Sequence, residues 1–553
     1  MRAILCSMAF GVVAAVSATA SADTGLMKPD TRILSLPDAA LGPYVWTFKG
    51  KLKYSDDLLT QRMDAKDPLR LFWLAFRLMR DEAKLGDDLA GARARKILDL
   101  LLDEYQPADR SEAGIHWQYG FDYEGIKSGW WSGMDAFFGP LVLYAAWQEY
   151  GIERYRDAAL KSARLSLQAP PKGGTIWQGQ DGCWVSEYTW KDMSRSDEYH
   201  VLNGHLFGLQ AIYMLGVLSG DSDFSNAYEC GVRGTKAMAL NFSNARNDWS
   251  WYQATPKVVN PPHYLLFEAN QHRALRLLTG DEYWQAGFDT RAAMFAGAYS
   301  PAVTKTPEGT YRVLLSMLGA PHPYWPDTYP MELKCTAGDV ERKSLGRNHY
   351  NEKKPYVERF IASVDLPSPP DSCAVSIDVF EDGLTQMTTA KSLPVVSAEP
   401  EQLKVAPKLS YNSTGFGANE QEVLVNPIGG SIEGRIELPI DEDMGPTETL
   451  ALVVTSELKT QLSFLLEDSK GVVSKRDYND IVAGKPNLVL VNRLGFVGED
   501  KQAKRIKSIT LRIHSGANKE QFKFSINDLQ MVRNAAQFET LLKSFGEGNF
   551  SIQ

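Results

Sequence analysis

A helical hairpin recurs along the first half of the sequence and limits the fold more than any other feature. Four segments begin with a glycine and continue as an amphipathic helix, starting at Gly86, Gly151, Gly220 and Gly280. An apolar-periodic run of helix length precedes each of them, for example PLRLFWLAFRLMRDEAKL and WSGMDAFFGPLVLYAAWQEY. Recurrence about every 60 to 70 residues is the sequence mark of stacked helix pairs.

Two architectures satisfy such a repeat, an open superhelix and a closed α/α toroid. Three of the repeats place an aromatic residue four positions after the glycine: Tyr155, Phe224 and Trp284. The connections between the helix pairs are long and rich in aromatic residues and glycine, and they cover residues 106–131, 169–198 and 243–262. Long connections favour the toroid, whose loops build a carbohydrate cleft.

The pattern changes after about residue 300, as expected for a chain of 553 residues that exceeds a single core. Residues 301–394 hold Pro-rich stretches such as APHPYWPDTYP and are expected to connect two domains. From 395 to 535, short runs such as KSITLRIHS alternate apolar and polar residues, which predicts an antiparallel β-sandwich for packing or for carbohydrate binding. The predicted class is multidomain α plus β, with an N-terminal extension (23–60), an α/α toroid (61–300) and a C-terminal tail (536–553) around these parts.

The first residues have the pattern of a secretory signal peptide. Arg2 precedes an apolar run, and Ala20-Ser21-Ala22 is a cleavage site of the A-x-A kind. We therefore expect residues 1–22 to be removed and the protein to be exported, either to a periplasm or to the medium. No later segment has the roughly 20 apolar residues that a membrane span needs.

Four cysteines remain after such cleavage, and an oxidising compartment favours disulfides among them. Cys335 and Cys373 are the favoured pair because both lie in one irregular region. No C-x-x-C or H-x-x-x-H spacing occurs, so we expect no zinc site.

Charge and motifs restrict the partners. The net charge of -9 and the pI of about 5.6 argue against a nucleic-acid partner, since phosphate binding needs a positive field. An acidic glycan needs only local cations and stays compatible. No dinucleotide or phosphate-loop motif is present, so no cofactor is expected, and the sequence leaves a homodimer open.

Three places in the helical half collect aromatic and polar residues. KSGWWSGMDAFFGP holds Trp131 and Asp135 at the entry to a helix, with Ser132 as a candidate N-cap. In EYHVLNGHLFGLQ, Asn203 is either a core asparagine or a sugar contact. Tyr264, Glu268 and Gln271 follow i, i+4 and i+7 spacing, so they line one face of a helix that is otherwise apolar. This stripe is either a solvated face or points into the lumen of the toroid.

These stretches resemble a known family. EY followed by YHVLNGHLFGLQAIYML, then HYLLFEANQHRAL, with GWWSGM upstream, is similar to the C-terminal catalytic domain of the D-glucuronyl C5-epimerases over about residues 115 to 297. That family converts D-glucuronic acid in a polysaccharide to L-iduronic acid and uses tyrosines and a glutamate. The resemblance implies Glu187, Tyr188 and Tyr264 as catalytic, with Tyr252 as a further tyrosine. QATPK after Tyr252 and β structure placed after the helical domain depart from the family pattern.

Inversion at carbon 5 needs a base on one face of the sugar and an acid on the other, because a single group would return the proton to the side it left. Tyr188 and Tyr264 are the expected pair, and Glu187 is expected to tune or orient them. The substrate carboxylate also needs neutral or cationic donors around it. The candidate substrate-binding residues are Trp131, Arg195, Asn203, His205, Glu268, Asn270 and Gln271, with Arg273 as a further donor.

Other functions stay open. A polysaccharide lyase would begin with the same proton abstraction and then eliminate the carbon 4 substituent. A glycoside hydrolase would need two carboxylates across a cleft. Its candidates are Asp122, Glu124, Asp135, Glu187 and Glu268. A non-catalytic glycan-binding protein is the third alternative.

The signal-peptide hypothesis predicts the first residue of the exported protein. N-terminal sequencing of the protein recovered after export should find Asp23 or a close neighbour, because cleavage follows Ala22. An intact Met1 in the soluble fraction would contradict the hypothesis.

Overall fold

A computed structural model describes most of the helical half and the strands of the second half. The described residues are 25–46, 55–103, 110–111, 114–123, 125–243, 249–260, 262–297, 299–317, 329–348, 360–378, 385–391, 395–398, 401–402, 416–418, 422–425, 433–443, 448–468, 473–492, 497–498, 505–514, 520–545 and 551–552. The expected signal peptide, residues 1–22, lies outside them.

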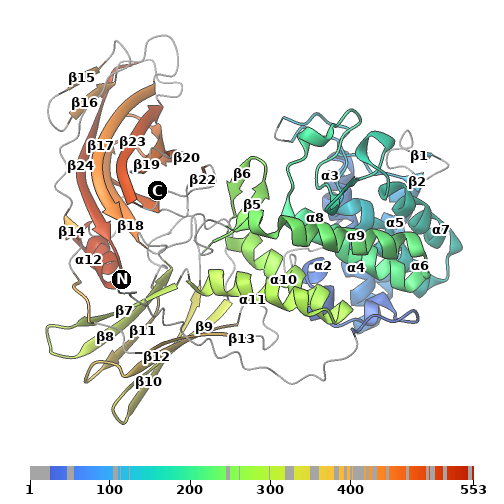
Figure 1. Ribbon diagram of the computed structural model, residues 1–553, viewed down its shortest axis with the longest axis horizontal. Coiled ribbons are helices and arrows are strands. Elements are labelled where there is room, and N and C mark those ends of the chain that lie inside the picture. Colours follow the sequence, from blue (N-terminus) through green and yellow to red (C-terminus); the bar gives the residue numbers. More distant parts are fainter. Residues whose placement is uncertain are drawn as a thin grey trace, which may run out of the picture. The chain divides into compact units, whose positions relative to one another are not determined.

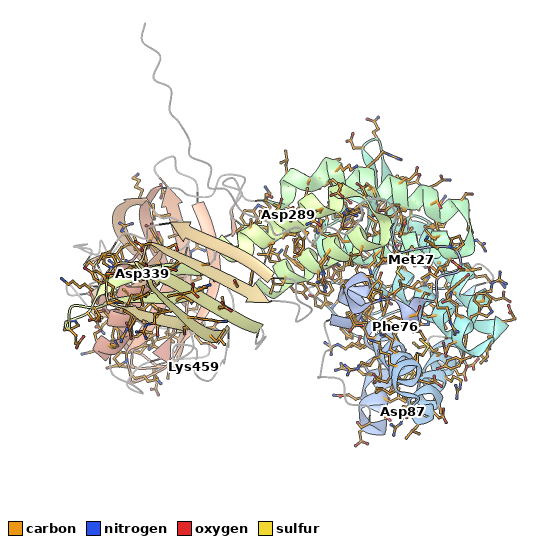
Figure 2. All side chains as sticks on the ribbon, turned by 90° about the horizontal axis from the view of Figure 1, so that it is seen from below. Met27, Phe76, Asp87, Asp289, Asp339 and Lys459 are labelled. Carbon is orange, nitrogen blue, oxygen red and sulfur yellow. A yellow bond between two sulfur atoms is a disulfide. The ribbon has the colours of Figure 1, made fainter. Side chains whose placement is uncertain are left out.

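The chain divides into two compact units. The helical unit is Ala22–Asn260 with Tyr264–Ala292, and the β unit contains Ala293–Gln553 (Figure 1). In Figure 2, Met27 and Phe76 mark the helical unit, and Asp339 and Lys459 mark the β unit.

Helical hairpins build the helical unit, as the repeat predicts. The first helix of each pair is α4 (Pro68–Leu85), α6 (Asp135–Tyr150), α8 (Leu202–Ser219) or α10 (Pro262–Thr279). The second helix is α5 (Asp88–Asp103), α7 (Glu153–Ser166), α9 (Ser222–Met238) or α11 (Glu282–Gly297). A short helix, α3 (Asp56–Asp64), precedes them. Helix α4 contacts α6, and α6 contacts α8, so successive pairs lie side by side.

The repeated glycines end the first helix of each pair and do not start the second. Gly86, Gly151, Gly220 and Gly280 have φ between 68° and 77°. Glycine adopts this left-handed conformation without a Cβ clash, and it lets the chain reverse within two or three residues. Tyr155, Phe224 and Trp284, four residues later, are at most 1% exposed. The shared glycine and aromatic residue therefore stop one helix and anchor the next against it.

The first and second helices of the pairs differ in burial. Every residue from 135 to 146 of α6 is buried, and α8 is buried over nearly its whole length. Helices α5, α7 and α9 bury one face only. A helix that is apolar all round lies in the interior. Helices α6 and α8 are therefore the inner helices of the unit.

The expected N-terminal extension (23–60) is not an appendage. Its residues 25–46 contain η1 (Ile33–Ser35), α1 (Asp38–Leu41) and α2 (Pro43–Trp46). Tyr44 is 2% exposed, stacks on Phe138 and donates a hydrogen bond to the carbonyl of Phe207 at 2.8 Å. An aromatic ring from this segment thus fills space between α6 and α8.

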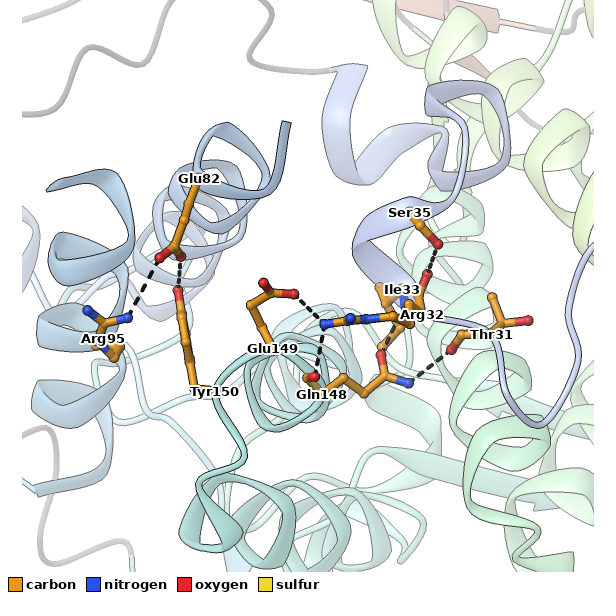
Figure 3. A network of polar contacts seen from close by, with 9 residues as sticks. All are labelled: Thr31, Arg32, Ile33, Ser35, Glu82, Arg95, Gln148, Glu149 and Tyr150. Carbon is orange, nitrogen blue, oxygen red and sulfur yellow. Dashed lines mark hydrogen bonds and ion pairs between the residues drawn. The ribbon is translucent and has the colours of Figure 1, made fainter. Parts of the chain in front are cut away.

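Polar contacts fix the same segment to the outside of the helices. Arg32 donates to the Glu149 carboxylate at 2.7 Å, and the Gln148 amide donates to the carbonyl of Thr31 at 2.9 Å (Figure 3). At the other end of the unit, the amide nitrogen of Leu26 donates to the carbonyl of Leu277 in α10 at 2.9 Å. The segment therefore touches both early and late helix pairs.

Several antiparallel sheets form the β unit. One sheet has the order β11 (Phe360–Leu366), β8 (Tyr311–Met317), β7 (Tyr299–Lys305). Another has the order β10 (Val340–Asn348), β9 (Tyr329–Ala337), β12 (Ser372–Asp378), β13 (Thr385–Lys391). The described residues of the expected connecting region, 301–394, therefore lie largely in strands.

Two larger sheets follow in the sequence. The first is β15 (Phe416–Ala418), β16 (Glu422–Val425), β24 (Phe522–Val532), β18 (Thr449–Ser456), β21 (Asn487–Asn492) and β25 (Ser551–Ile552), with β14 (Glu401–Gln402) paired to β24. The second is β17 (Glu433–Asp443), β23 (Arg505–His514), β19 (Thr460–Asp468), β20 (Val473–Ile481) and β22 (Val497–Gly498).

The two larger sheets share one hydrophobic cluster. It joins Leu452 of β18 and Phe524 of β24 with Phe464 of β19 and Leu511 of β23. On another face, α12 (Ala535–Phe545) packs Phe538 against the strands of the first sheet. The expected tail, 536–553, thus begins with a packed helix, as NAAQFETLLKSF suggests.

Two disulfides cross-link the described cysteines. Cys335 and Cys373 are bonded, as predicted, and they face each other in the register of β9 and β12. Cys183 and Cys230 are bonded as well, and they join β4 (Gly182–Val185) to α9. None of the described helices combines the length and apolar character that a bilayer crossing requires.

The hairpin of β3 (Ile176–Gly179) and β4 (Gly182–Val185) packs closely against α9, with a glycine at the contact. A Cβ at Gly234 would come within 2.1 Å of the carbonyl oxygen of Cys183. The backbones therefore touch where no side chain fits.

Gly234→Ala should lower the free energy of unfolding of the helical unit by about 1–3 kcal/mol, because the backbone must shift to admit a methyl group. Gly297→Ala is the matched control, since nothing lies within 4 Å of its Cβ position. Denaturant unfolding followed by tryptophan fluorescence measures both, and equal stabilities for the two variants would contradict the packing.

Candidate functional site

Two connections and the first turn of α10 bring the expected catalytic residues together. Glu187 and Tyr188 follow β4, Tyr252 lies in β5 (Trp251–Ala254), and Tyr264 is in the first turn of α10. Strand β5 pairs with β6 (Lys257–Val259). We call these four residues the tyrosine cluster.

Backbone pairing fixes the connections to each other. Trp131 forms an antiparallel bridge with Thr189, directly after Tyr188. Val201 at the start of α8 forms one with Gln253, directly after Tyr252. The tyrosines are thus presented by segments that are themselves bonded to the ends of inner helices.

The side chains of the cluster are in contact. The hydroxyls of Tyr188 and Tyr252 are 3.1 Å apart, and the Tyr252 hydroxyl donates to Oε1 of Glu187 at 3.4 Å. The rings of Tyr252 and Tyr264 have centroids 4.9 Å apart. Tyr252 is therefore the central member, although its sequence motif is the weakest of the three.

Both hydrogen-bonded phenols are held in the neutral form. Burial raises the pKa of Tyr188 well above its ordinary value, and the negative charge of Glu187 raises it further. Burial and Glu187 raise the pKa of Tyr252 in the same way. A neutral phenol is a proton donor, so these tyrosines rest in the acid form beside an anionic acceptor.

Glu187 lies against the first turn of α8. A Cβ at Gly204 would stand 2.4 Å from Oε2 of Glu187 and 2.5 Å from its Cβ. Glycine at this position lets the carboxylate approach the helix N-terminus, where unpaired amides and the helix dipole favour negative charge. The VLNG motif therefore positions Glu187 because Gly204 has no side chain that would occupy the place of the carboxylate.

Sequence reasoning missed Glu198, which connects the loop of Glu187 to the turn before α8. It accepts a hydrogen bond from the hydroxyl of Ser186 and another from the amide of His200, the latter at 2.9 Å. Ser186 precedes Glu187, and His200 has the unusual φ of 51°. The buried carboxyl thus holds the loop of Glu187 to the strained turn that leads into α8. The sequence signal that could have identified Glu198 is its position directly before the run Tyr-His-Val-Leu-Asn-Gly.

Two expected sugar contacts belong to the interior instead. His205 is 0% exposed, accepts from the amide of Val185 at 2.9 Å through Nδ1, and contacts the Thr235 hydroxyl at 2.9 Å through Nε2. Burial lowers its pKa to about 3, so the imidazole is neutral, and both of its nitrogens contact protein groups. Trp131 is 3% exposed and donates to the carbonyl of Gly174. These placements contradict substrate contact by either side chain.

Of the polar stripe of α10, Glu268 and Gln271 are buried, whereas Tyr264 is partly exposed. Glu268 forms an ion pair with Arg291 at 2.8 Å and accepts from the Asn260 amide at 2.9 Å. The Gln271 amide donates to the backbone carbonyl of Asn203 at 2.7 Å. These contacts join α10 to its neighbours, which is why an apolar helix carries polar groups here.

The remaining expected donors make protein contacts. Asn270, 1% exposed, accepts from Arg273 at 3.1 Å. Asn203 is 1% exposed, and its side-chain oxygen Oδ1 has no hydrogen-bond partner among the described residues. Arg195 is exposed and donates to the carbonyl of Gln178 in the β3–β4 hairpin.

Other aromatic residues surround Tyr188. Tyr123 stacks on its ring at 5.2 Å, Trp130 lies at 5.7 Å and Tyr199 meets it edge-on at 6.0 Å. The tryptophan next to the tyrosine cluster is therefore Trp130 and not its expected neighbour Trp131. Within the described residues, no three His, Cys, Asp or Glu side chains come together in a way that suits a metal ion.

Residues 111–291 match the family model of the D-glucuronyl C5-epimerase C-terminus. This segment contains the whole tyrosine cluster and nearly all of the helix pairs from α6 to α11. The family resemblance of the sequence is thereby confirmed for this part of the chain. No curated protein matches the chain.

Solved structures give weak likenesses only. The agarase AgWH50C is 14% identical, with a TM-score of 0.19 over 26% of this chain, and the chain spans 24% of that protein. Cellobiose 2-epimerase from Bacillus thermoamylovorans is 14% identical, with a TM-score of 0.30 over 42% of this chain and 59% of its own. A UGL variant with the saccharide dGlcA-Glc-Rha-Glc is 13% identical, with a TM-score of 0.33 over 47% and 72%. Scores of this size carry no conclusion about fold or function.

Glu198 predicts a pH-dependent stability. Burial raises its pKa from 4.5 to about 7, which outweighs its hydrogen bonds. A raised pKa means that the folded state holds the proton more tightly, so its contribution is complete below about pH 4.5 and is lost as the pH rises through 7. Glu198→Gln imitates the protonated acid, and its stability relative to wild type should rise over this window by on the order of 3 kcal/mol.

Urea unfolding at several pH values between 4.5 and 8 measures the difference. Glu282→Gln, on an exposed carboxylate of α11, is the control and should leave the pH profile parallel to wild type. A difference between Glu198→Gln and wild type that stays constant with pH would contradict the buried-acid assignment.

Proposed function

We propose that the helical unit is a uronate C5-epimerase that converts D-glucuronic acid to L-iduronic acid within an acidic polysaccharide. One observation carries the proposal: three tyrosines and a glutamate, from two connections and from the first turn of α10, meet in one cluster. The position of this cluster, inside the segment that matches the epimerase family model, further supports the proposal.

The chemistry requires a proton to leave one face of carbon 5 and another to arrive on the opposite face. Two groups that flank one carbon each stand about 3–3.5 Å from it, so their oxygens are about 6 Å apart. The hydroxyls of Tyr188 and Tyr252 are 3.1 Å apart. We therefore assign Tyr188 and Tyr252 to the same face of the sugar and Tyr264 to the other.

The proton balance follows from this assignment. In one direction, the carbon 5 proton passes to the oxygen of Tyr252 while the Tyr252 proton passes to Glu187, which stands 3.4 Å away. Tyr264 gives its proton to the other face of carbon 5 and becomes a phenolate. Proton exchange with water then restores Tyr264 and Glu187, and no redox step is needed.

A two-carboxylate hydrolase has less support. Asp122 is exposed and bonded to Lys127 at 2.6 Å, and Asp135 and Glu268 are buried with protein partners. Of the candidate carboxylates that the structure describes, Glu187 is the one in the tyrosine cluster, and Glu124 lies outside the described residues. A lyase shares the first proton transfer, so it stays the second candidate.

Broader features belong to the same proposal. We infer an α/α toroid for the helix pairs, supported by buried inner helices that contact one another in sequence order. We infer a β-sandwich for the two larger sheets, supported by their common hydrophobic cluster. Export is consistent with two disulfides.

Exchange of the carbon 5 hydrogen is the direct test. A heparosan-like polymer incubated with the protein in heavy water should gain deuterium at carbon 5 and give iduronate signals in NMR spectra. Tyr252→Phe and Tyr264→Phe should each lower the exchange rate at least about 10²-fold, since each loses a proton carrier. Tyr188→Phe removes the hydroxyl that contacts the Tyr252 hydroxyl at 3.1 Å, and it should lower the rate less.

Tyr283→Phe, on the outer helix α11, controls for a lost phenol elsewhere and should exchange like wild type. An unsaturated sugar end would identify a lyase. Absence of exchange with every uronate polymer would reject the epimerase and favour glycan binding.

A further inference from the structure

A buried carboxylate on α10 reaches the connection that carries Tyr252. Glu268 is 0% exposed and lies one helical turn after Tyr264 on the same helix. Its Oε1 accepts a hydrogen bond from the Asn260 side-chain amide at 2.9 Å, and its Oε2 accepts from Nε of Arg291 in α11 at 2.8 Å. Asn260 directly follows β6, so one side chain of α10 holds the end of the β5–β6 hairpin.

Asn260 extends this contact to the start of β5. Its side-chain nitrogen also donates to Oγ of Ser250 at 2.8 Å, and its backbone amide donates to the Ser250 carbonyl at 3.1 Å. Its backbone carbonyl accepts from the indole of Trp249 at 2.8 Å. All three residues are at most 1% exposed. We call the contacts from Glu268 through Asn260 to Ser250 the carboxylate link, and it ends two residues before Tyr252.

Strand pairing alone does not determine where Tyr252 lies. Trp251 pairs with Val259 in β6, and Gln253 pairs with Val258. Tyr252 is therefore an extra residue between two rungs of the ladder. Such a bulge redirects a side chain, and contacts outside the ladder must hold that direction. The bridge from Gln253 to the start of α8 holds the chain after the bulge, and the carboxylate link holds it before the bulge.

The carboxylate determines which way the Asn260 amide faces. An ionised carboxylate only accepts hydrogen bonds, so the amide must present its nitrogen to Glu268. The same nitrogen donates to Ser250, while Oδ1 of Asn260 has no hydrogen-bond partner among the described residues. A buried ion pair such as that of Glu268 with Arg291 adds little net stability compared with apolar side chains of similar size. Apolar side chains, however, cannot supply the narrow distance and angle of a hydrogen bond.

The carboxylate link connects two tyrosines that the proposed reaction places on opposite faces of the sugar. Tyr264 and Glu268 belong to consecutive turns of α10. The rings of Tyr252 and Tyr264 have centroids 4.9 Å apart and an interplanar angle of 49°. A misplacement of about 1 Å can cost about 10²-fold in rate, so the position of one ring relative to the other matters for the reaction.

We propose that Glu268 is a positioning residue for the proton transfers and that it holds Tyr252 beside Tyr264 through the carboxylate link. This inference rests on the proposed function. The Glu268 carboxylate is buried and bonded to protein groups through both oxygens, so it has no part in binding the polymer. Its effect is on the rate of proton transfer.

Two double variants that differ at one position test the link. Glu268→Gln with Arg291→Met keeps an acceptor for the Asn260 amide, whereas Glu268→Leu with Arg291→Met removes it. Arg291→Met in both avoids a cation left without its partner. With a heparosan-like polymer in heavy water, the first variant should keep kcat within about threefold of wild type. The second should lose about 10²-fold in kcat with KM nearly unchanged.

Two single variants complete the comparison. Asn260→Ala breaks the carboxylate link but keeps the ion pair, so kcat should fall as in Glu268→Leu with Arg291→Met. Gln210→Met removes a buried amide that donates to carbonyls of α1, and it should lose stability while kcat stays at the wild-type value. Equal kcat in the two double variants, or a rise in KM at constant kcat when the link is broken, would overturn the proposal.

A measurement without substrate separates the two proposals. A meta-fluorotyrosine placed at Tyr252 reports the surroundings of that ring by fluorine NMR. Its signal should shift in both variants that break the carboxylate link, and it should stay in place in Glu268→Gln with Arg291→Met and in Gln210→Met. Such shifts without carbon 5 exchange in wild type would reject the epimerase and keep the link. Exchange in wild type, with a signal that no variant moves, would reject the link and keep the epimerase.

Discussion

The burial of α8 over nearly its whole length is the constraint on which the rest of the helical unit depends. A helix with apolar residues on nearly every side must be covered on every side, and its few polar groups must bond to protein. His205 meets this requirement through Val185 and Thr235, and the Gln210 amide nitrogen meets it through carbonyls of α1. The oxygens Oδ1 of Asn203 and Oε1 of Gln210 have no hydrogen-bond partner among the described residues. Only the end of such a helix is available for chemistry. The tyrosine cluster is found there, with Glu187 over Gly204.

Much of the helical architecture was predictable because it rests on local rules. A glycine that ends a helix and an aromatic residue four positions later recur at fixed spacing, and the structure gives both a clear part in each hairpin. The repeated glycine is a turn residue, as the sequence pattern indicates, and it ends one helix shortly before the next begins. The β half was harder. Prolines between 301 and 394 suggested a connection, yet strands paired around them, because proline disrupts a sheet only where its missing N–H is needed.

The sequence predicts which residues come together in the site, but it does not predict the direction of each side chain. Glu187, Tyr188, Tyr252 and Tyr264 come together, as the order of their motifs along the sequence suggests. Trp130 and Trp131 are adjacent in sequence but point to different surroundings, and alternation along an extended segment cannot say which faces the site. Glu268 and Gln271 share a helix face, as their spacing predicts. That face meets other helices, a fact that depends on neighbours distant in sequence.

The N-terminal segment has a consequence for how the helical unit assembles. Leu26 hydrogen-bonds to Leu277, and Tyr44 packs between helices that lie about one hundred to one hundred and sixty residues further on. Such contacts have high sequence separation, so they are slow to form and come late in folding. A chain emerging from the ribosome cannot complete the environment of its own first residues until α10 has followed. The last helix pair therefore sets the earliest moment at which the start of the chain can become protected.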